Sequence, residues 1–270
     1  MQGLRLVDAL RTAGPAAYEE TPPPADLREV VACLWLRVVR GPEAGRSSPI
    51  LPDGCGDLMV YDDFPPVVAG PDATTRWVTF AGGTVIVGAR FRPGGIRAVV
   101  GCAATTILGR TVRLSDLTTT AAALHERLLL ARSVRRRQRL LADWIRAALD
   151  GRALLDRRVR AACRRLTGDP HLEIGTLADR SDWNVRAVHR DFLAACGYGP
   201  KHFQRIMRIQ RAIRAAHDPS RPNLVEVALA AGYADQAHMT RDFRQITGFT
   251  PAQQLATARP EFGLWIAHGW

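Results

Sequence analysis

Apolar residues are spaced differently in the two halves of the chain. Between residues 27 and 91, short runs of Val, Leu, Ile and aromatic residues are broken by Gly, Pro and Asp, which is typical of β-strands joined by turns. From about residue 105 onward, apolar residues recur every three or four positions, which is typical of amphipathic helices. The pattern therefore predicts an α+β chain, with a β domain first and helices after it.

Six strands are predicted in the first half, at residues 30–39, 48–51, 57–61, 66–69, 77–80 and 84–91. Several short strands with turn signals between them favour a small antiparallel barrel or sandwich, which we assign to residues 26–115. Residues 1–25 are interpreted as an extension that contains a short helical pattern at residues 4–11 and ends in Thr21-Pro22-Pro23-Pro24.

A helical linker is predicted at residues 116–168, and apolar spacing is clearest at residues 114–117, 124–130 and 140–149. This linker is able to pair with its copy on a second subunit. The arginine-rich run at residues 135–139 is interpreted as a solvated helix face, with phosphate contact as the alternative. Gly168-Asp169-Pro170 ends the segment, because the residue before a proline disfavours helix.

The last part of the chain contains an internal repeat, in which residues 181–200 resemble residues 232–251. The same residue types return 51 positions later: Arg190, Asp191, Phe192, Gly197 and Pro200 match Arg241, Asp242, Phe243, Gly248 and Pro251. Asn184 and Asp235 open the two copies and are able to cap a helix, and Gly followed by Pro closes each copy.

Each copy predicts a helix with one apolar face and one polar face. The apolar faces consist of Val185, Val188 and Phe192 in the first copy, and of Met239, Phe243 and Ile246 in the second. The opposite faces carry side chains that reach phosphates and base edges. A second short helix precedes each copy, at residues 174–180 and 224–231, so the repeat predicts two helix-turn-helix units.

These residues resemble the AraC/XylS family of transcription regulators, whose DNA-binding domain has two such units joined by one long helix. The matching residues are Leu177, Ala178, Asn184, Arg190, Phe192, Gly197, Pro200, Phe203, Arg208, Ala212, Gly232, Asp235, Gln236, Arg241, Phe243, Gly248 and Pro251. The resemblance implies a sequence-specific DNA-binding regulator whose DNA-binding domain spans residues 169–256. Residues 52–58 and 87–95 resemble the cupin-like sensor or dimerisation domain of one branch of these regulators.

The resemblance also implies roles for particular side chains. Base reading is assigned to Arg186, His189 and Arg190 in the first unit, and to Gln236, Ala237, Thr240 and Arg241 in the second. Phosphate contact is assigned to Lys201, Arg208, Asn223 and Arg244. The structural alternative for Arg190 and Arg241 is an ion pair with Asp191 or Asp242. A joining helix at residues 200–217, roughly 25 Å long at 1.5 Å per residue, would separate the recognition helices by close to one duplex turn of about 34 Å.

Four charged residues of the β domain are candidates for an effector pocket: Asp53, Asp57, Arg90 and Arg92. Their structural interpretation is charge pairing across neighbouring strands, and their functional interpretation is orientation of a small molecule inside an apolar pocket. The first histidine is His125, beyond all the predicted strands, so we predict no metal, no cofactor and no catalytic residue in this domain.

Composition narrows the class of partner. The 270 residues carry a formal net charge of +11 with an isoelectric point near 10.6, so an anionic partner is expected. The five cysteines lack a C-x-x-C pair, and the broken apolar pattern at the start does not predict a signal peptide, so we expect reduced thiols and a cytoplasmic location. No segment approaches the ~20 apolar residues of a membrane span, so no membrane partner is predicted.

The sequence therefore predicts a transcription regulator that binds double-stranded promoter or operator DNA and is not an enzyme. A small-molecule effector, RNA polymerase and a second copy of the chain are its further candidate partners. An alternative is an enzyme, such as a DNA-repair protein with a nucleophilic cysteine, fused to a helix-turn-helix module. Non-specific DNA compaction is the third hypothesis. Residues 257–270 form a C-terminal tail whose Phe262, Leu264, Trp265 and Trp270 are expected to pack back onto the protein.

Overall fold

The computed structural model describes residues 18–40, 44–62, 64–152, 156–216 and 223–257. Within these ranges an antiparallel β domain is followed by helices, which confirms the predicted α+β class. The helical pattern predicted at residues 4–11 and the apolar residues of the tail at 258–270 lie outside the described residues.

All six predicted strands are present, and two further strands were missed. The strands are β1 (Tyr18–Thr21), β2 (Val31–Val38), β3 (Ser47–Ile50), β4 (Gly56–Tyr61), β5 (Val67–Ala69), β6 (Arg76–Thr79), β7 (Val85–Phe91) and β8 (Thr111–Arg113). β1 lies in the segment interpreted as an extension, and β8 lies where helix was expected. β1 (Tyr-Glu-Glu-Thr) and β8 (Thr-Val-Arg) each contain a single apolar residue, so no apolar run marks them as strands.

The strands form two separate sheets. Six pair in the order β1-β2-β7-β4-β5-β8, every neighbouring pair antiparallel, and β3 pairs with β6 as a second, two-stranded sheet. The predicted antiparallel domain is thus confirmed, although hydrogen bonds do not close the described strands into one barrel.

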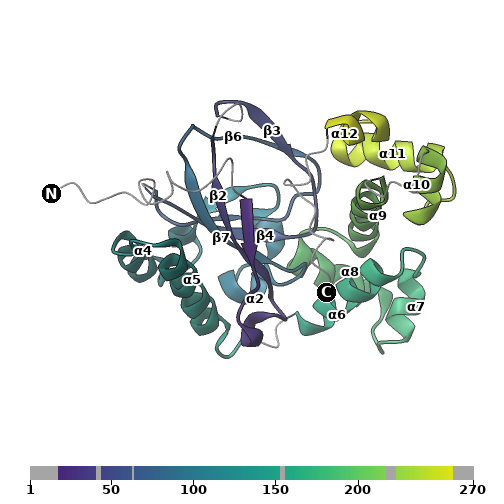
Figure 1. Ribbon diagram of the computed structural model, residues 1–270. Helices are drawn as coiled ribbons and strands as arrows, with labels where there is room; N and C mark the ends of the chain where they lie inside the picture. The colour runs from purple at the N-terminus through teal and green to yellow at the C-terminus, as the bar shows by residue number, and fades with distance from the viewer. Residues whose placement is uncertain (1–17, 41–43, 63, 153–155, 217–222, 258–270) are drawn as a thin grey trace.

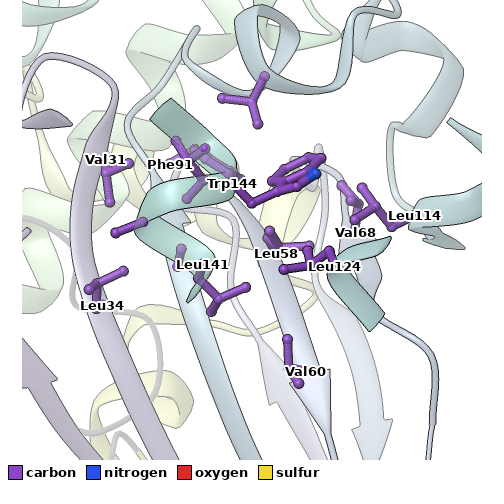
Figure 2. Packing of buried hydrophobic residues seen from close by; sticks show 14 of the residues in the cluster. Val31, Leu34, Leu58, Val60, Val68, Phe91, Leu114, Leu124, Leu141 and Trp144 are labelled. Atoms are coloured by element: carbon purple, nitrogen blue, oxygen red, sulfur yellow. The ribbon is translucent and has the colours of Figure 1, made fainter. Parts of the chain in front are cut away.

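Side chains alternate between the two faces of the larger sheet, as the strand period of two requires. On one face, Leu34, Leu58 and Val60 join the main hydrophobic core. Figure 2 shows these residues packed against Leu141 and Trp144 of the helical layer. On the other face, residues such as Trp35 and Met59 form a smaller cluster that faces away from this core.

Two groups of helices flank the β domain (Figure 1). The first group is α4 (Ala121–Leu129) and α5 (Val134–Leu149), with 3-10 turns at Ala25–Leu27 and Leu114–Asp116. Two short helices, α2 (Ile96–Val100) and α3 (Ala104–Ile107), contact helices of the second group. α5 begins after Ser133, whose side chain accepts a hydrogen bond from the Arg136 backbone. The arginine-rich run is not wholly solvated, because Arg137 is buried and pairs with Asp62, which holds the β4–β5 loop against α5.

The second group lies on the opposite side of the β domain from α4 and α5 (Figure 1). It consists of α6 (Arg157–Gly168), α7 (Ile174–Asp179), α8 (Val185–Cys196), α9 (Pro200–Ala216), α10 (Leu224–Ala230), α11 (Gln236–Thr247) and α12 (Pro251–Thr257). Their apolar faces share a second core that also includes Leu51 and Cys55 of the β domain. The two parts of the chain are therefore packed together through apolar contacts.

Candidate nucleic-acid interface and enclosed cavity

The two predicted recognition helices are α8 and α11, and both are capped as the sequence predicts. The Asn184 side chain accepts a hydrogen bond from the Ala187 backbone at 2.8 Å, and the Asp235 side chain accepts one from the His238 backbone at 2.6 Å. Gly197 and Gly248 end the helices at φ 84° and φ 78°, in the left-handed region that glycine adopts without strain.

The two turns that precede these helices differ in length by one residue. In the first, the Trp183 backbone donates to the Ala178 carbonyl; in the second, the Tyr233 backbone donates to the Ala228 carbonyl, each at 3.0 Å. Trp183 directly precedes the cap residue of α8, whereas Ala234 follows Tyr233 before the cap of α11. The helices before the turns are thus related by 50 positions, and the recognition helices by 51.

An arginine covers the aromatic ring of each turn. The Arg158 guanidinium of α6 lies 5.3 Å from the Trp183 ring, and the Arg208 guanidinium of α9 lies 5.3 Å from the Tyr233 ring. Since these arginines are also 50 positions apart, the repeat comprises three helices: α6, α7 and α8 match α9, α10 and α11. Arg208, predicted to contact phosphate, is half-buried in this stack.

On α8, the candidate base-reading residues Arg186, His189 and Arg190 are all exposed. Arg190 is 75% exposed, although its Nε donates to Asp191 at 2.9 Å, which is the pair that the structural alternative proposed. Asp191 also accepts a hydrogen bond from the Trp183 indole at 3.2 Å. Both carboxylate oxygens of Asp191 are thereby engaged.

On α11, the exposed residues Gln236, Ala237, Arg241 and Arg244 line a shallow open hollow together with the half-buried Thr240. The Thr240 hydroxyl donates back to the Gln236 carbonyl at 2.8 Å. Asp242 is buried and pairs with Arg205 of α9 at 2.9 Å, so the proposed Arg241–Asp242 pair is replaced by a pair with another helix.

The remaining candidates for phosphate contact have different surroundings. Lys201 is exposed in the first turn of α9. Asn223 caps α10, because its side-chain oxygen accepts hydrogen bonds from the Val225 and Glu226 backbones, each at 3.0 Å. Lys201 therefore offers a solvated charge, whereas the side-chain oxygen of Asn223 is already used inside the protein.

A cavity of about 260 Å³ lies on the second face of the larger sheet, and β3 and β6 contribute to its walls. Aromatic side chains surround it: Tyr18, Trp35 and Tyr61 of the larger sheet, and Phe80, which directly follows β6. Gly88 leaves room for one of them, because a Cβ at this position would lie 2.2 Å from the Trp35 ring. The cavity also contains polar groups from β4, β7 and the loops beside them.

Three of the four predicted pocket residues line this cavity. Arg90 contacts Asp57 at 3.3 Å, across neighbouring strands, and lies 3.9 Å from Asp53. Asp57 also accepts a hydrogen bond from the Trp35 indole at 2.9 Å. Burial raises the pKa of Asp53 to about 6, against the lowering effect of Arg90. Asp53, Asp57 and Arg90 therefore pair with one another and also line the cavity, so both interpretations apply to them.

The fourth predicted residue, Arg92, is not among the residues that line the cavity. Its Nε donates to the Arg28 carbonyl at 2.7 Å. β7 ends at Phe91, and the β2–β7 register shifts between Val31 and Cys33, so the alternation that brings Arg90 into the cavity does not extend to Arg92. The prediction for Arg92 therefore differs from the structure.

The sequence analysis missed several residues that line the cavity. Asp72 and Arg76 form a pair in which the Arg76 Nε donates to both carboxylate oxygens at 3.1 Å. Trp35 could have been assigned by alternation, because its strand neighbours Leu34 and Leu36 face the main core. No comparable pattern marks Asp72, which lies in a loop.

Comparison with protein families separates the same two parts of the chain. A family model described as a helix-turn-helix domain matches residues 177–256, and one for a domain of unknown function, DUF6597, matches residues 19–113. The chain is therefore a DNA-binding transcription regulator with a helix-turn-helix domain. No curated protein matches this regulator.

Solved structures of two other proteins match the chain over different lengths. A probable AraC family transcriptional regulator from Rhodopseudomonas palustris is 27% identical, covering 38% of the regulator and 98% of that chain, with a TM-score of 0.34. ToxT from Vibrio cholerae is 10% identical, covering 83% of the regulator and 95% of its own chain, with a TM-score of 0.45. ToxT bound to an unsaturated fatty acid is 7% identical, with coverages of 84% and 95% and a TM-score of 0.43.

One loop of the cavity contacts the second recognition helix of the regulator. The Thr75 backbone donates to the Ile246 carbonyl at 3.1 Å, and the Thr75 hydroxyl donates to the Thr247 carbonyl at 2.9 Å. The Trp77 ring lies 6.0 Å from the Phe249 ring just beyond. The last turn of α11 is thus attached to the segment between Asp72 and Arg76.

A second loop of the cavity contacts α9. Gln210, fully buried, donates to the Pro52 carbonyl at 2.7 Å, and a Cβ at Gly54 would lie 2.9 Å from the Phe203 ring. His202 bonds the Ala73 carbonyl of the first loop at 2.9 Å, and burial lowers the pKa of this histidine. Both loops therefore contact the cavity on one side and the DNA-binding helices on the other.

The cysteine side chains are largely enclosed. Cys33, Cys55, Cys163 and Cys196 are buried, and Cys102 is partly buried. Burial raises the pKa of the Cys33, Cys55 and Cys163 thiols, so the neutral form is favoured. Among the described residues, no group of three His, Cys, Asp or Glu side chains is arranged to hold a metal ion, and no helix is long and apolar enough to cross a membrane.

Proposed function

We propose that the regulator reads DNA with α8 and α11 in two successive major grooves. The observation that carries this proposal is the pair of capped helices with exposed polar faces, joined by a single helix. α9 has 17 residues, which corresponds to roughly 25 Å at 1.5 Å per residue. That length suits recognition helices about one duplex turn apart.

Base discrimination is assigned to Arg186, His189 and Arg190 of α8, and to Gln236, Ala237, Thr240 and Arg241 of α11. Arginine pairs favourably with guanine and glutamine with adenine, each at about 1–3 kcal/mol of discrimination. Lys201 and Arg244 are exposed and supply phosphate contacts. Arg208 and Asn223 instead stabilise the second unit. Arg208 stacks on the Tyr233 ring, and Asn223 caps α10.

Selection of bound sequences from a random duplex pool at physiological salt tests this proposal. The expected result is a motif of two short boxes about one helical turn apart. A footprint shorter than one turn would contradict simultaneous binding by both helices. Equal recovery of all sequences would favour non-specific DNA compaction instead.

We further propose that a small molecule in the cavity controls DNA binding. Support comes from the loops at Pro52–Cys55 and Asp72–Arg76, which line the cavity and also bond α9 and α11. A change in the position of either loop on binding would be transmitted directly to the recognition units. The measurement is operator affinity with the cavity empty and filled.

The proposed role is regulatory and not enzymatic. The alternative repair enzyme needs an accessible nucleophilic thiolate, but four cysteines are buried, and burial favours the neutral thiol at Cys33, Cys55 and Cys163. Methyl transfer to a cysteine, detected by mass spectrometry after incubation with alkylated DNA, would contradict the proposal. Pairing with a second copy through residues 116–168 and contact with RNA polymerase stay predictions.

A further inference from the structure

The cavity lining combines aromatic and charged side chains. Aromatic rings of Tyr18, Trp35, Tyr61 and Phe80 supply apolar walls. Asp53, Asp57 and Arg90 gather at one side. At about 260 Å³ the cavity is smaller than the ~300–1,000 Å³ typical of drug-sized ligands, so it suits a compact molecule with one polar group.

The polar side has an excess of negative charge. Asp53 and Asp57 share a single cation, Arg90, which leaves a formal charge of one negative unit. The neighbouring Asp72 and Arg76 neutralise each other through both carboxylate oxygens. The other arginine of the lining, Arg37, lies over the Phe80 ring at 5.0 Å, so the charges of the whole lining balance and the negative excess is local to Asp53 and Asp57.

The carboxylates at this side have capacity for another hydrogen-bond donor. One oxygen of Asp53 accepts from the Cys55 backbone at 2.8 Å; among the described residues, the other approaches only Arg90, at 3.9 Å. In Asp57, one oxygen accepts from both Trp35 and Arg90. A carboxylate oxygen has room for about two hydrogen bonds, so each residue retains acceptor sites toward the cavity.

We infer that the cavity binds a small monocationic amine with a compact, aromatic-sized body, its ammonium group placed between Asp53 and Asp57. This assignment of ligand class rests on the proposed effector role of the cavity. An ammonium group supplies three donors and neutralises the excess charge. The Trp35 ring, whose N–H donates to Asp57, lies beside the same place and supplies an apolar wall for the body of the molecule. A carboxylate ligand would instead meet two carboxylates.

Calorimetric titration of the full-length protein with three matched probes tests the inference. Phenethylamine, 2-phenylethanol and 3-phenylpropionate share one ring and carry a cationic, a neutral and an anionic group. We expect phenethylamine to bind at least tenfold more tightly than the alcohol, and the acid to bind most weakly. Tighter binding of the acid, or no binding of any probe at 10 mM, overturns the inference.

Charge-neutral variants locate the amine. Asp53→Asn keeps an oxygen for the Cys55 backbone but removes the charge, so phenethylamine affinity should fall at least tenfold while 2-phenylethanol affinity changes less than twofold. Asp57→Asn provides a second variant with the same expectation. Asp116→Asn is the matched control, since Asp116 is exposed and is not part of the cavity lining. Equal effects of Asp53→Asn and Asp116→Asn on phenethylamine affinity would contradict the placement of the amine beside Asp53.

Operator affinity, measured with and without saturating phenethylamine, separates ligand class from effector control. Amine binding that depends on Asp53 but leaves operator affinity unchanged would confirm that the cavity binds an amine. It would contradict the proposal that a ligand in the cavity controls DNA binding. If no probe binds but Thr75 or Gln210 variants still change operator affinity, the assignment of an amine ligand is wrong. The loops of the cavity would then still be shown to influence DNA binding.

Discussion

The two helix-turn-helix units are copies in sequence but are anchored differently. In the first, Asp191 binds its own neighbour Arg190 and the Trp183 indole, so the charges stay within one turn and its recognition helix. In the second, the equivalent Asp242 is buried against Arg205 of α9. The aspartate of the first unit therefore pairs with an exposed arginine on α8 itself, whereas the aspartate of the second unit attaches α11 to α9.

The far ends of the two recognition helices differ as well. Gly197, after α8, lies against Leu108 and the end of α3, and Cys196 packs on Cys163 of α6 with the sulfur atoms 3.8 Å apart. The last carbonyls of α11 accept hydrogen bonds from Thr75, in a loop that lines the cavity. The first unit is held mainly by packing, whereas the second also has polar bonds to a loop that lines the cavity.

Removing the two equivalent carboxylates should give the largest difference between the units. Asp242→Ala leaves Arg205 without its buried partner, so we expect a loss of about 2–3 kcal/mol of unfolding free energy. Asp191→Ala removes a largely exposed pair and one indole hydrogen bond, at about 1 kcal/mol. Denaturant unfolding of the two variants measures both. Equal losses would mean that the units are anchored alike.

Arginine truncation compares the reading surfaces. Arg241→Ala should cost about 1–3 kcal/mol at one box of the operator, because its guanidinium is exposed and is not paired with Asp242. Arg190→Ala should cost less at the other box, since Arg190 must exchange its contact with Asp191 for DNA. Binding to operators altered in one box at a time measures each effect. A uniform loss at all sequences would assign either arginine to phosphate contact.

The turns provide a third comparison. Gly232 has φ 86°, and a Cβ there would lie 2.5 Å from Pro170, so Gly232→Ala should destabilise the protein by more than about 1 kcal/mol. The first turn has a left-handed residue with a side chain, Asp182 at φ 47°. Asp182→Gly should be neutral or stabilising by up to about 1 kcal/mol. Thermal unfolding distinguishes the two, and a stabilising Gly232→Ala would refute the close approach to Pro170.

The smallest expected effect concerns the bond between the cavity loop and α11. Thr75→Val preserves shape but removes the hydroxyl that donates to Thr247, at about 0.5–1.5 kcal/mol. We expect a change in affinity for the box read by α11 and none for the box read by α8. Thr105→Val, at an exposed position on α3, is the control. Identical changes at both boxes would show that the loop does not act on the second unit alone.

Secondary structure was largely predictable where several residues repeat a period. The six predicted strands, α8, α9 and α11 follow from alternation or helical spacing, together with caps such as Asn184 and Asp235. β1 and β8 were missed because neighbouring strands, and not local pattern, stabilise them. Pro251, interpreted as a helix stop, also begins α12, as Pro200 begins α9, since proline is accepted in a first helical turn.

The candidate sites were predictable to different degrees. Exposed positions on a capped helix follow from the angle between successive residues, so Arg186, His189 and Gln236 could be placed before the fold was known. The cavity could not be derived in this way. Asp72 and Arg76 reach it from a loop and a strand start, and Arg92 leaves it because the strand ends one residue earlier.

The sequence alone determined the duplicated helix-turn-helix units, because caps, glycine stops and apolar spacing act within a few residues of each other. Only the tertiary structure decided which partner each copied residue has: Asp191 keeps Arg190, whereas Asp242 takes Arg205. It also decided that Thr75 bonds α11 and that Pro52 bonds Gln210. These last two contacts join residues 172 and 158 positions apart, and their geometry depends on how whole elements pack.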